Sequence, residues 1–177
     1  MTDKPNIIYI LADFGELEKF GHNPSHVFRG HKADIYEGGH RIPLIVRWPA
    51  RIRGGAISKQ TVCLSDLLST VAEIIGRKLP DNAGEDSVSN LPVWLEKQKE
   101  DEHLREAIVH HSINGSFSIR QGRWKLEFCP GSGGWSYPVP GTDDEAGMPP
   151  VQLYDLEADI GERANLQDKH PDVMAKL

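Results

Sequence analysis

The sequence has few cysteines, no long apolar run and no excess of positive charge. Cys63 and Cys129 are the only cysteines among 177 residues, so a disulfide framework is excluded, and their spacing matches no zinc motif. No stretch of about 18 apolar residues is present, so we expect no membrane span. The net charge of −6 argues against a nucleic-acid partner. The first residues lack the basic-then-apolar pattern of a signal peptide. The localisation is left open between a cytoplasmic protein and one whose leader was removed.

Two apolar runs in the first fifty residues predict strands. Residues 7–11 are apolar and rich in β-branched side chains, which is typical of an inner parallel strand. Residues 42–48 have the length and composition of a strand buried on both faces. Gly38 and Gly39 come just before the second run, and we expect positive φ angles there that allow a sharp turn.

Residues 65–76 form the clearest predicted helix. Ser65 can cap its first turn, and Gly76 suits the position just after its last turn. The helical spacing predicts one buried apolar face, made of Leu67, Leu68, Val71, Ile74 and Ile75.

Beyond residue 103 the pattern changes to short strands. Asn114-Gly115 between residues 107–112 and 116–120 predicts a hairpin. In the next strand, residues 123–128, strict alternation predicts that three side chains are buried and three face solvent. The buried set is Trp124, Leu126 and Phe128, and the solvent set is Arg123, Lys125 and Glu127. A last strand over 151–156 and a helix from about Pro171 complete the chain.

This change predicts two domains, residues 1–103 and residues 104–177. His110 and His111 invite a metal interpretation, but neighbours in a strand point to opposite faces, which favours structural roles. The Gly/Pro/aromatic segment 129–141 is expected to be a loop with no phosphate-binding motif.

Two charged side chains are candidate site residues. Asp13 follows the first strand at its carboxyl end, where α/β sheets place ligands, so it is a candidate hard-cation ligand. A helix cap or loop aspartate is the alternative. Lys32 taken alone is most simply a solvated surface lysine.

The surrounding motif changes the interpretation of Lys32. The pattern Lys-x-x-x-Tyr-Glu-Gly-Gly-x-Arg-x-Pro over residues 32–43, followed by Val-Arg-Trp-Pro, resembles the sulfatase family of the alkaline-phosphatase-like superfamily. The family's lysine at this position contacts the sulfate group, which implies that role for Lys32. The opening residues 4–13 also resemble the family, with Asp13 at its first metal-binding aspartate and Phe14 at the second. Residues 153–156 and the segment after them resemble the family's C-terminus.

The resemblance implies what is missing as well as what is present. Only about twenty residues separate the two motifs, where the family has several hundred, so we infer a large internal deletion near Asp13. The family's nucleophile lies in Cys/Ser-x-Pro-x-Arg and becomes formylglycine, and no segment of this chain matches that motif. We therefore expect no nucleophile, and calcium or magnesium, which the resemblance implies, is expected not to be retained because one aspartate cannot hold it.

The expected fold is α/β, with a partial sulfatase-like parallel or mixed sheet and helices, a small C-terminal antiparallel sheet and a terminal helix. The expected function is that of a sulfatase-family protein, a sulfuric ester hydrolase by resemblance, that is catalytically incompetent as it stands. A non-catalytic binding or interaction module and a truncated gene product are the alternatives. The implied partner is a sulfate ester, and self-association through exposed sheet edges is also expected.

Overall fold

The computed structural model describes residues 6–9, 20–99 and 102–177. The chain divides into two compact units, which are treated separately below. The first unit contains Met1–Tyr9 and Leu44–Glu106, and the second contains Ile10–Pro43 and Ala107–Leu177. This grouping differs from the division at residue 103 in two respects. The first unit extends to Glu106. The segment that carries Lys32 belongs with the C-terminal strands.

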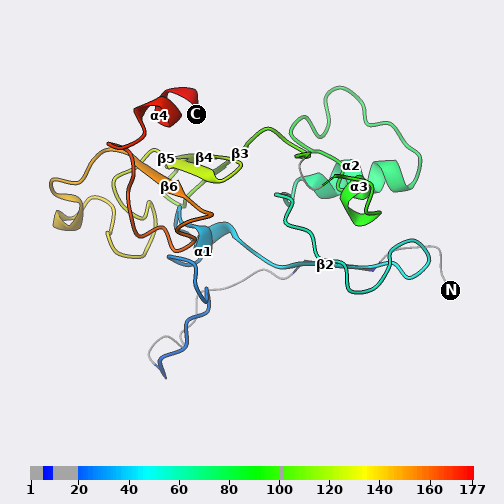
Figure 1. Ribbon diagram of the computed structural model, residues 1–177, viewed down its shortest axis with the longest axis horizontal. Coiled ribbons are helices and arrows are strands. Elements are labelled where there is room, and N and C mark those ends of the chain that lie inside the picture. Colours follow the sequence, from blue (N-terminus) through cyan, green and yellow to red (C-terminus); the bar gives the residue numbers. More distant parts are fainter. Residues whose placement is uncertain (1–5, 10–19, 100–101) are drawn as a thin grey trace. The chain divides into compact units, whose positions relative to one another are not determined.

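The first unit contains a two-stranded ribbon and two helices (Figure 1). Strand β1, Asn6–Tyr9, pairs antiparallel with β2, Leu44–Arg47. The prediction of an inner parallel strand is therefore wrong, and so is the prediction that the second run is buried on both faces. Partly buried and exposed side chains alternate along β2, and Ile45 is 51% exposed. An antiparallel ribbon can keep one face in solvent, whereas a parallel sheet is covered on both faces.

Helix α2, Asp66–Ile74, confirms the predicted helix but not its predicted cap or buried face. The Ser65 side chain makes no capping hydrogen bond. Instead the Asp66 carboxylate accepts a hydrogen bond from the Cys63 N–H (2.7 Å) and pairs with Arg105. Gly76 follows the helix with φ +65°, as predicted.

Two of the three buried residues of α2 are polar, and of the predicted apolar face Ile74 packs against the core of this unit. Asp66, Thr70 and Ala72 are its buried residues, whereas Leu68, Val71 and Ile75 are between 40% and 63% exposed. The buried side is satisfied by its neighbours, since the Thr70 hydroxyl accepts the Asn90 N–H at 2.9 Å. Helix α3, Leu91–Trp94, contributes the core of this unit together with Trp48.

The second unit contains a four-stranded antiparallel sheet in the order β3-β4-β5-β6 (Figure 1). The strands are β3 Ile108–His111, β4 Phe117–Gln121, β5 Trp124–Glu127 and β6 Gln152–Asp155. The predicted hairpin is confirmed, with Gly115 at φ +86°. Two short helices, α1 (Glu37–His40) and α4 (Pro171–Lys176), and the 3-10 turn η2 (Asp143–Glu145) complete the unit. The mixed α/β class, the C-terminal antiparallel sheet and the terminal helix are confirmed.

Strand β5 is buried on both faces, which corrects the predicted alternation. Lys125 and Glu127 are fully buried, Leu126 is almost fully buried, and Phe128 is 49% exposed. The segment before α1 covers the face expected to meet solvent. Its residues Ile35 and Tyr36 form a core with Cys129, Tyr154 and Leu156. None of the helices in the described ranges has the length and apolar content needed to cross a membrane.

Candidate functional site

Lys32 is presented by a turn with an unusual backbone. The turn is stabilised by a hydrogen bond from the Asp34 N–H to the His31 carbonyl (3.0 Å). Ala33 has φ +88°, a left-handed conformation that costs a residue with a Cβ about 1–3 kcal/mol. The hydrogen bond from the Ile113 N–H to the Ala33 carbonyl (2.9 Å) helps to hold this conformation.

Gly38 and Gly39 are needed for close approach and not for positive φ. Both lie inside α1, and neither has a positive φ, so that prediction is wrong. A Cβ on Gly38 would lie 2.2 Å from the Gly30 carbonyl oxygen, and a Cβ on Gly39 would lie 2.3 Å from the Asp34 carbonyl oxygen. The two glycines therefore let the helix pack directly against the backbone of the Lys32 turn.

Asp34 joins the Lys32 turn to the loop that carries Trp135. Its carboxylate is fully buried. One oxygen accepts the N–H groups of Trp135 (2.8 Å) and Ser136 (3.0 Å). The other accepts the His31 N–H (2.8 Å) and the Ser136 hydroxyl. Four donors around one buried carboxylate fix the two segments against each other.

Ser136, His31 and Asp34 have the residue types of a hydrolytic triad but not its geometry. The Ser136 hydroxyl contacts His31 Nδ1 at 2.9 Å, and Asp34 lies 3.7 Å from that same nitrogen. In a triad the acid and the nucleophile bind opposite nitrogens of the imidazole. Here the Ser136 hydroxyl donates directly to the Asp34 carboxylate, so the cluster holds the two segments together and has a structural role.

A buried charge cluster anchors the segment that leads into α1. The Lys125 ammonium donates to the Ile35 carbonyl (2.9 Å) and to the Glu162 carboxylate (2.7 Å). Glu162 in turn accepts the Glu37 N–H at 2.7 Å, at the start of α1. Lys125 also lies 3.2 Å from Glu127 and 3.4 Å from Glu37. Side chains of β5 and of the segment after β6 thus hold the backbone next to the Lys32 turn in place.

The cluster has more carboxylates than its lysine can neutralise. Burial opposes the charge of Lys125, but three neighbouring carboxylates outweigh that cost and raise its pKa. Burial also opposes ionisation of Glu37, yet Lys125, Arg120 and Arg41 together lower its pKa. Glu127 is fully buried, and burial raises its pKa well above the ordinary range although Lys125 lies 3.2 Å away. Burial also raises the pKa of Glu162, and Glu127 is the carboxyl of the cluster whose charged form burial disfavours most.

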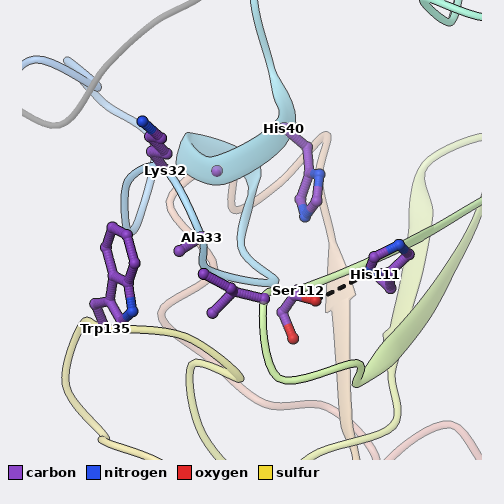
Figure 2. Close-up of a pocket in the computed structure, with 8 residues that line it drawn as sticks. Lys32, Ala33, His40, His111, Ser112 and Trp135 are labelled. Atoms are coloured by element: carbon purple, nitrogen blue, oxygen red, sulfur yellow. Dashed lines mark hydrogen bonds between the residues drawn. The ribbon is translucent and has the colours of Figure 1, made fainter.

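A pocket of about 300 Å³ opens between the Lys32 turn, α1, the end of β3 and the Trp135 loop (Figure 2). Figure 2 shows Lys32 and Trp135 on one side of the pocket and His40 and His111 on the other. It is lined by Lys32, Ala33, Gly39, His40, His111, Ser112, Ile113 and Trp135.

The two adjacent histidines of β3 lie in different surroundings. His111 lines the pocket, whereas the His110 ring lies against the His40 ring, with ring centres 3.9 Å apart and planes tilted by 50°. His110 Nε2 also contacts the Ser118 hydroxyl at 2.8 Å. Burial lowers the pKa of His40 to about 4 and that of His110 to about 2. Both rings are therefore neutral at pH 7.

The described residues do not fit a divalent metal ion. Nowhere in residues 6–9, 20–99 or 102–177 do three His, Cys, Asp or Glu side chains gather closely enough to hold one. Asp13, the sequence-based candidate ligand, lies outside the described residues.

Comparison with known proteins places this arrangement among the sulfatases. No family model matches the sequence. An N-acetylgalactosamine-6-O-sulfatase of Bacteroides thetaiotaomicron is 36% identical over 162 residues, covering 89% of this chain and 30% of the relative. Arylsulfatase A of Bos taurus is 30% identical over 176 residues, covering 94% of this chain and 34% of the relative.

Solved structures give the same result. A Bacteroides thetaiotaomicron structure, described in connection with the metabolism of multiple glycosaminoglycans, superimposes with a TM-score of 0.72 at 32% identity, covering 90% of this chain and 32% of the other. A sulfatase from Pseudoalteromonas sp. shares the fold, with a TM-score of 0.65 at 21% identity, covering 84% of this chain and 30% of the other.

The fold is that of part of an alkaline-phosphatase-like protein. The chain is a homologue of the sulfatases over most of its length, which confirms the family predicted from the sequence. It spans about a third of the length of these relatives.

The sequence pointed to Lys32 on one wall of the pocket, but it did not point to the residues of the other walls. Lys32 lines the pocket, and its proposed sulfate contact stays a prediction. His40 was passed over because it stands at a variable position of the motif. Trp135 was assigned only to a loop, and Asp34 looked like an ordinary turn aspartate. The contact that explains Gly134 appears only in the structure, where an added Cβ would lie 2.4 Å from the Asp34 carboxylate.

Proposed function

We propose that this chain binds sulfate esters, with the sulfate group held by Lys32 in the pocket. The observation that carries the proposal is the position of Lys32, since the lysine of the sulfatase-like motif lines a pocket whose walls are fixed by buried groups. The relatives named as sulfatases support the ligand class. A lysine beside a partly desolvated anion contributes a charge-assisted interaction that is stronger than its counterpart at an open surface.

Removing the Lys32 charge tests the proposal. We expect Lys32→Met to weaken binding of a sulfate ester or of inorganic sulfate about tenfold, which corresponds to about 1.4 kcal/mol. Titration calorimetry at low ionic strength measures the change. Lys169→Met is the matched control because Lys169 is also an exposed lysine of the second unit and lies outside the pocket. Equal affinities of wild type and Lys32→Met for sulfate would remove the basis of the proposal.

We further propose that the chain by itself does not hydrolyse the bound ester. Sulfatase-type catalysis needs a formylglycine nucleophile, and the sequence contains no Cys/Ser-x-Pro-x-Arg segment from which to form one. Loss of a nucleophile alone costs several orders of magnitude in rate. Lys32 then contributes to binding of the ester and not to its hydrolysis.

A turnover assay tests the proposal that the chain does not hydrolyse the bound ester. Purified protein with a chromogenic aryl sulfate and added calcium or magnesium is expected to release product no faster than Lys32→Met under the same conditions. Turnover above that of the variant, proportional to protein concentration, would contradict the proposal of a non-hydrolytic site.

A further inference from the structure

The exposed side of α2 carries a continuous apolar stripe. Leu64, Leu68, Val71 and Ile75 are between 40% and 63% exposed. Their spacing of four, three and four residues places them along one line of a helix. Leu64 and Ile75 flank the helix and continue its geometry, since the Leu64 carbonyl accepts the N–H three residues on (3.3 Å) and the Ile75 N–H donates to the Val71 carbonyl (3.1 Å). Large apolar side chains that gather in this way at a surface mark an interaction site.

The stripe cannot turn inward, because the other sides of α2 are already fixed. Ile74 packs against the core of the first unit. The buried Asp66 carboxylate pairs with Arg105, and the Thr70 hydroxyl accepts the Asn90 N–H at 2.9 Å. Rotation of the helix would break these contacts and leave buried polar groups without partners, so the stripe is a stable feature of the surface.

The stripe is complementary to itself under a two-fold rotation. When two copies of α2 lie antiparallel with the axis midway along the stripe, Leu64 of one copy meets Ile75 of the other, and Leu68 meets Val71. Each apolar side chain then contacts an apolar side chain of the second copy. A symmetric dimer needs a surface of this kind, in which one patch serves both partners.

The charges at the two ends of α2 favour the same antiparallel arrangement. Arg77 and Lys78 are exposed just after the helix. Glu85 and Asp86 are exposed beside its start, because the hydroxyl of the next residue, Ser87, donates to the carbonyl that precedes the helix (2.7 Å). Antiparallel packing brings the basic end of one copy towards the acidic segment of the other, twice over, whereas parallel packing brings like charges together.

We propose that α2 is the interface of a symmetric dimer, in which two copies of this chain pack their apolar stripes against each other in antiparallel orientation. Four half-exposed side chains bury less than the 800 Å² or so per partner of a standard interface, so we expect a reversible dimer with a dissociation constant on the order of 100 µM. The proposal is independent of sulfate-ester binding, since α2 belongs to the first unit and Lys32 to the second.

Sedimentation velocity on the wild-type chain tests whether the dimer forms. We expect the average mass to rise from that of a monomer towards that of a dimer between about 10 µM and about 500 µM protein, by mass action. A chain that stays monomeric up to the upper concentration would overturn the proposal.

Two charged variants test whether the stripe is the interface. Leu64→Glu and Ile75→Lys each place a charge against an apolar side chain of the second copy, so each alone is expected to weaken self-association about tenfold or more. Ile45→Glu is the matched control, because Ile45 is similarly exposed (51%) but lies on β2. Self-association that resists both stripe variants, or that Ile45→Glu weakens as much, would overturn the assignment to α2.

Mixing the two variants tests the antiparallel orientation. In a mixed dimer, Glu at position 64 of one copy meets Lys at position 75 of the other, while the second contact between these positions stays apolar. We therefore expect an equimolar mixture of Leu64→Glu and Ile75→Lys to associate about tenfold more tightly than either variant alone. Recovery also shows that both variants are folded. Absence of recovery would overturn the antiparallel arrangement, because parallel packing brings each charge against the uncharged residue at its own position.

Discussion

Replacing Lys125 with methionine is expected to lower the free energy of unfolding of the second unit by about 3–5 kcal/mol. The variant removes the ammonium that pairs with Glu37, Glu127 and Glu162 and leaves the Ile35 carbonyl without its buried donor. Breaking a buried ion cluster in this way is costly because the remaining charges stay desolvated. Urea denaturation and hydrogen exchange of the β5 amides both measure the loss of unfolding free energy. Lys169→Met is the control and is expected to change stability by less than about 0.5 kcal/mol.

Glu127→Gln separates the effect of the Glu127 charge on stability from the effect of its packing in the same cluster. Glu127 has its pKa raised by burial in the folded state, so it binds its proton more tightly when folded than when unfolded. The linkage relation then makes wild-type stability fall as pH rises from about 4.5, the unfolded pKa, towards the folded pKa. Glu127→Gln is expected to remove that slope and to cost little at pH 7. A loss as large as that of Lys125→Met would contradict a protonated Glu127.

Asp34→Ala is expected to destabilise the second unit by about 3 kcal/mol and to weaken sulfate-ester binding through the pocket walls. The variant leaves three backbone N–H groups and the Ser136 hydroxyl without their acceptor. Each buried donor left unpaired costs about 1–3 kcal/mol, partly recovered by relaxation.

Thermal unfolding and calorimetric titration on the same sample give both effects of Asp34→Ala. Asp172→Ala, at an exposed aspartate of α4, is the control. A variant with wild-type stability and wild-type binding would show that the two loops hold their positions without this carboxylate.

The sequence predicted the elements whose structure is set locally. The hairpin at Gly115 and the helix that Gly76 follows depend on turn chemistry and periodicity within a few residues, and both are present. Lys32 was found because a motif marked it. In each case the signal lies inside one short stretch of chain.

Features set by distant contacts were missed or predicted wrongly. The alternation in β5 placed Lys125 and Glu127 in solvent, because nothing within 123–128 reveals that residues 35–37 cover that face. Gly38 and Gly39 looked like a turn because their actual constraint, the backbone of the Lys32 turn, lies up to nine residues away. The apolar positions of α2 follow a helical period, yet Leu68, Val71 and Ile75 are exposed. Asp66 and Thr70 are buried instead, because they find partners in Arg105 and Asn90.

Arg29 ties the start of the Lys32 segment to the far end of the polypeptide. Its guanidinium donates to the Tyr154 hydroxyl (3.0 Å) and to the Glu162 carbonyl (2.8 Å), a separation of 133 residues in the second case. Such contacts form late, because the loop-closure entropy of a long intervening chain has to be overcome first. During synthesis on the ribosome the contact between Arg29 and the Glu162 carbonyl can therefore form only after residue 162 has emerged, and a nascent chain that stops short of that point lacks it.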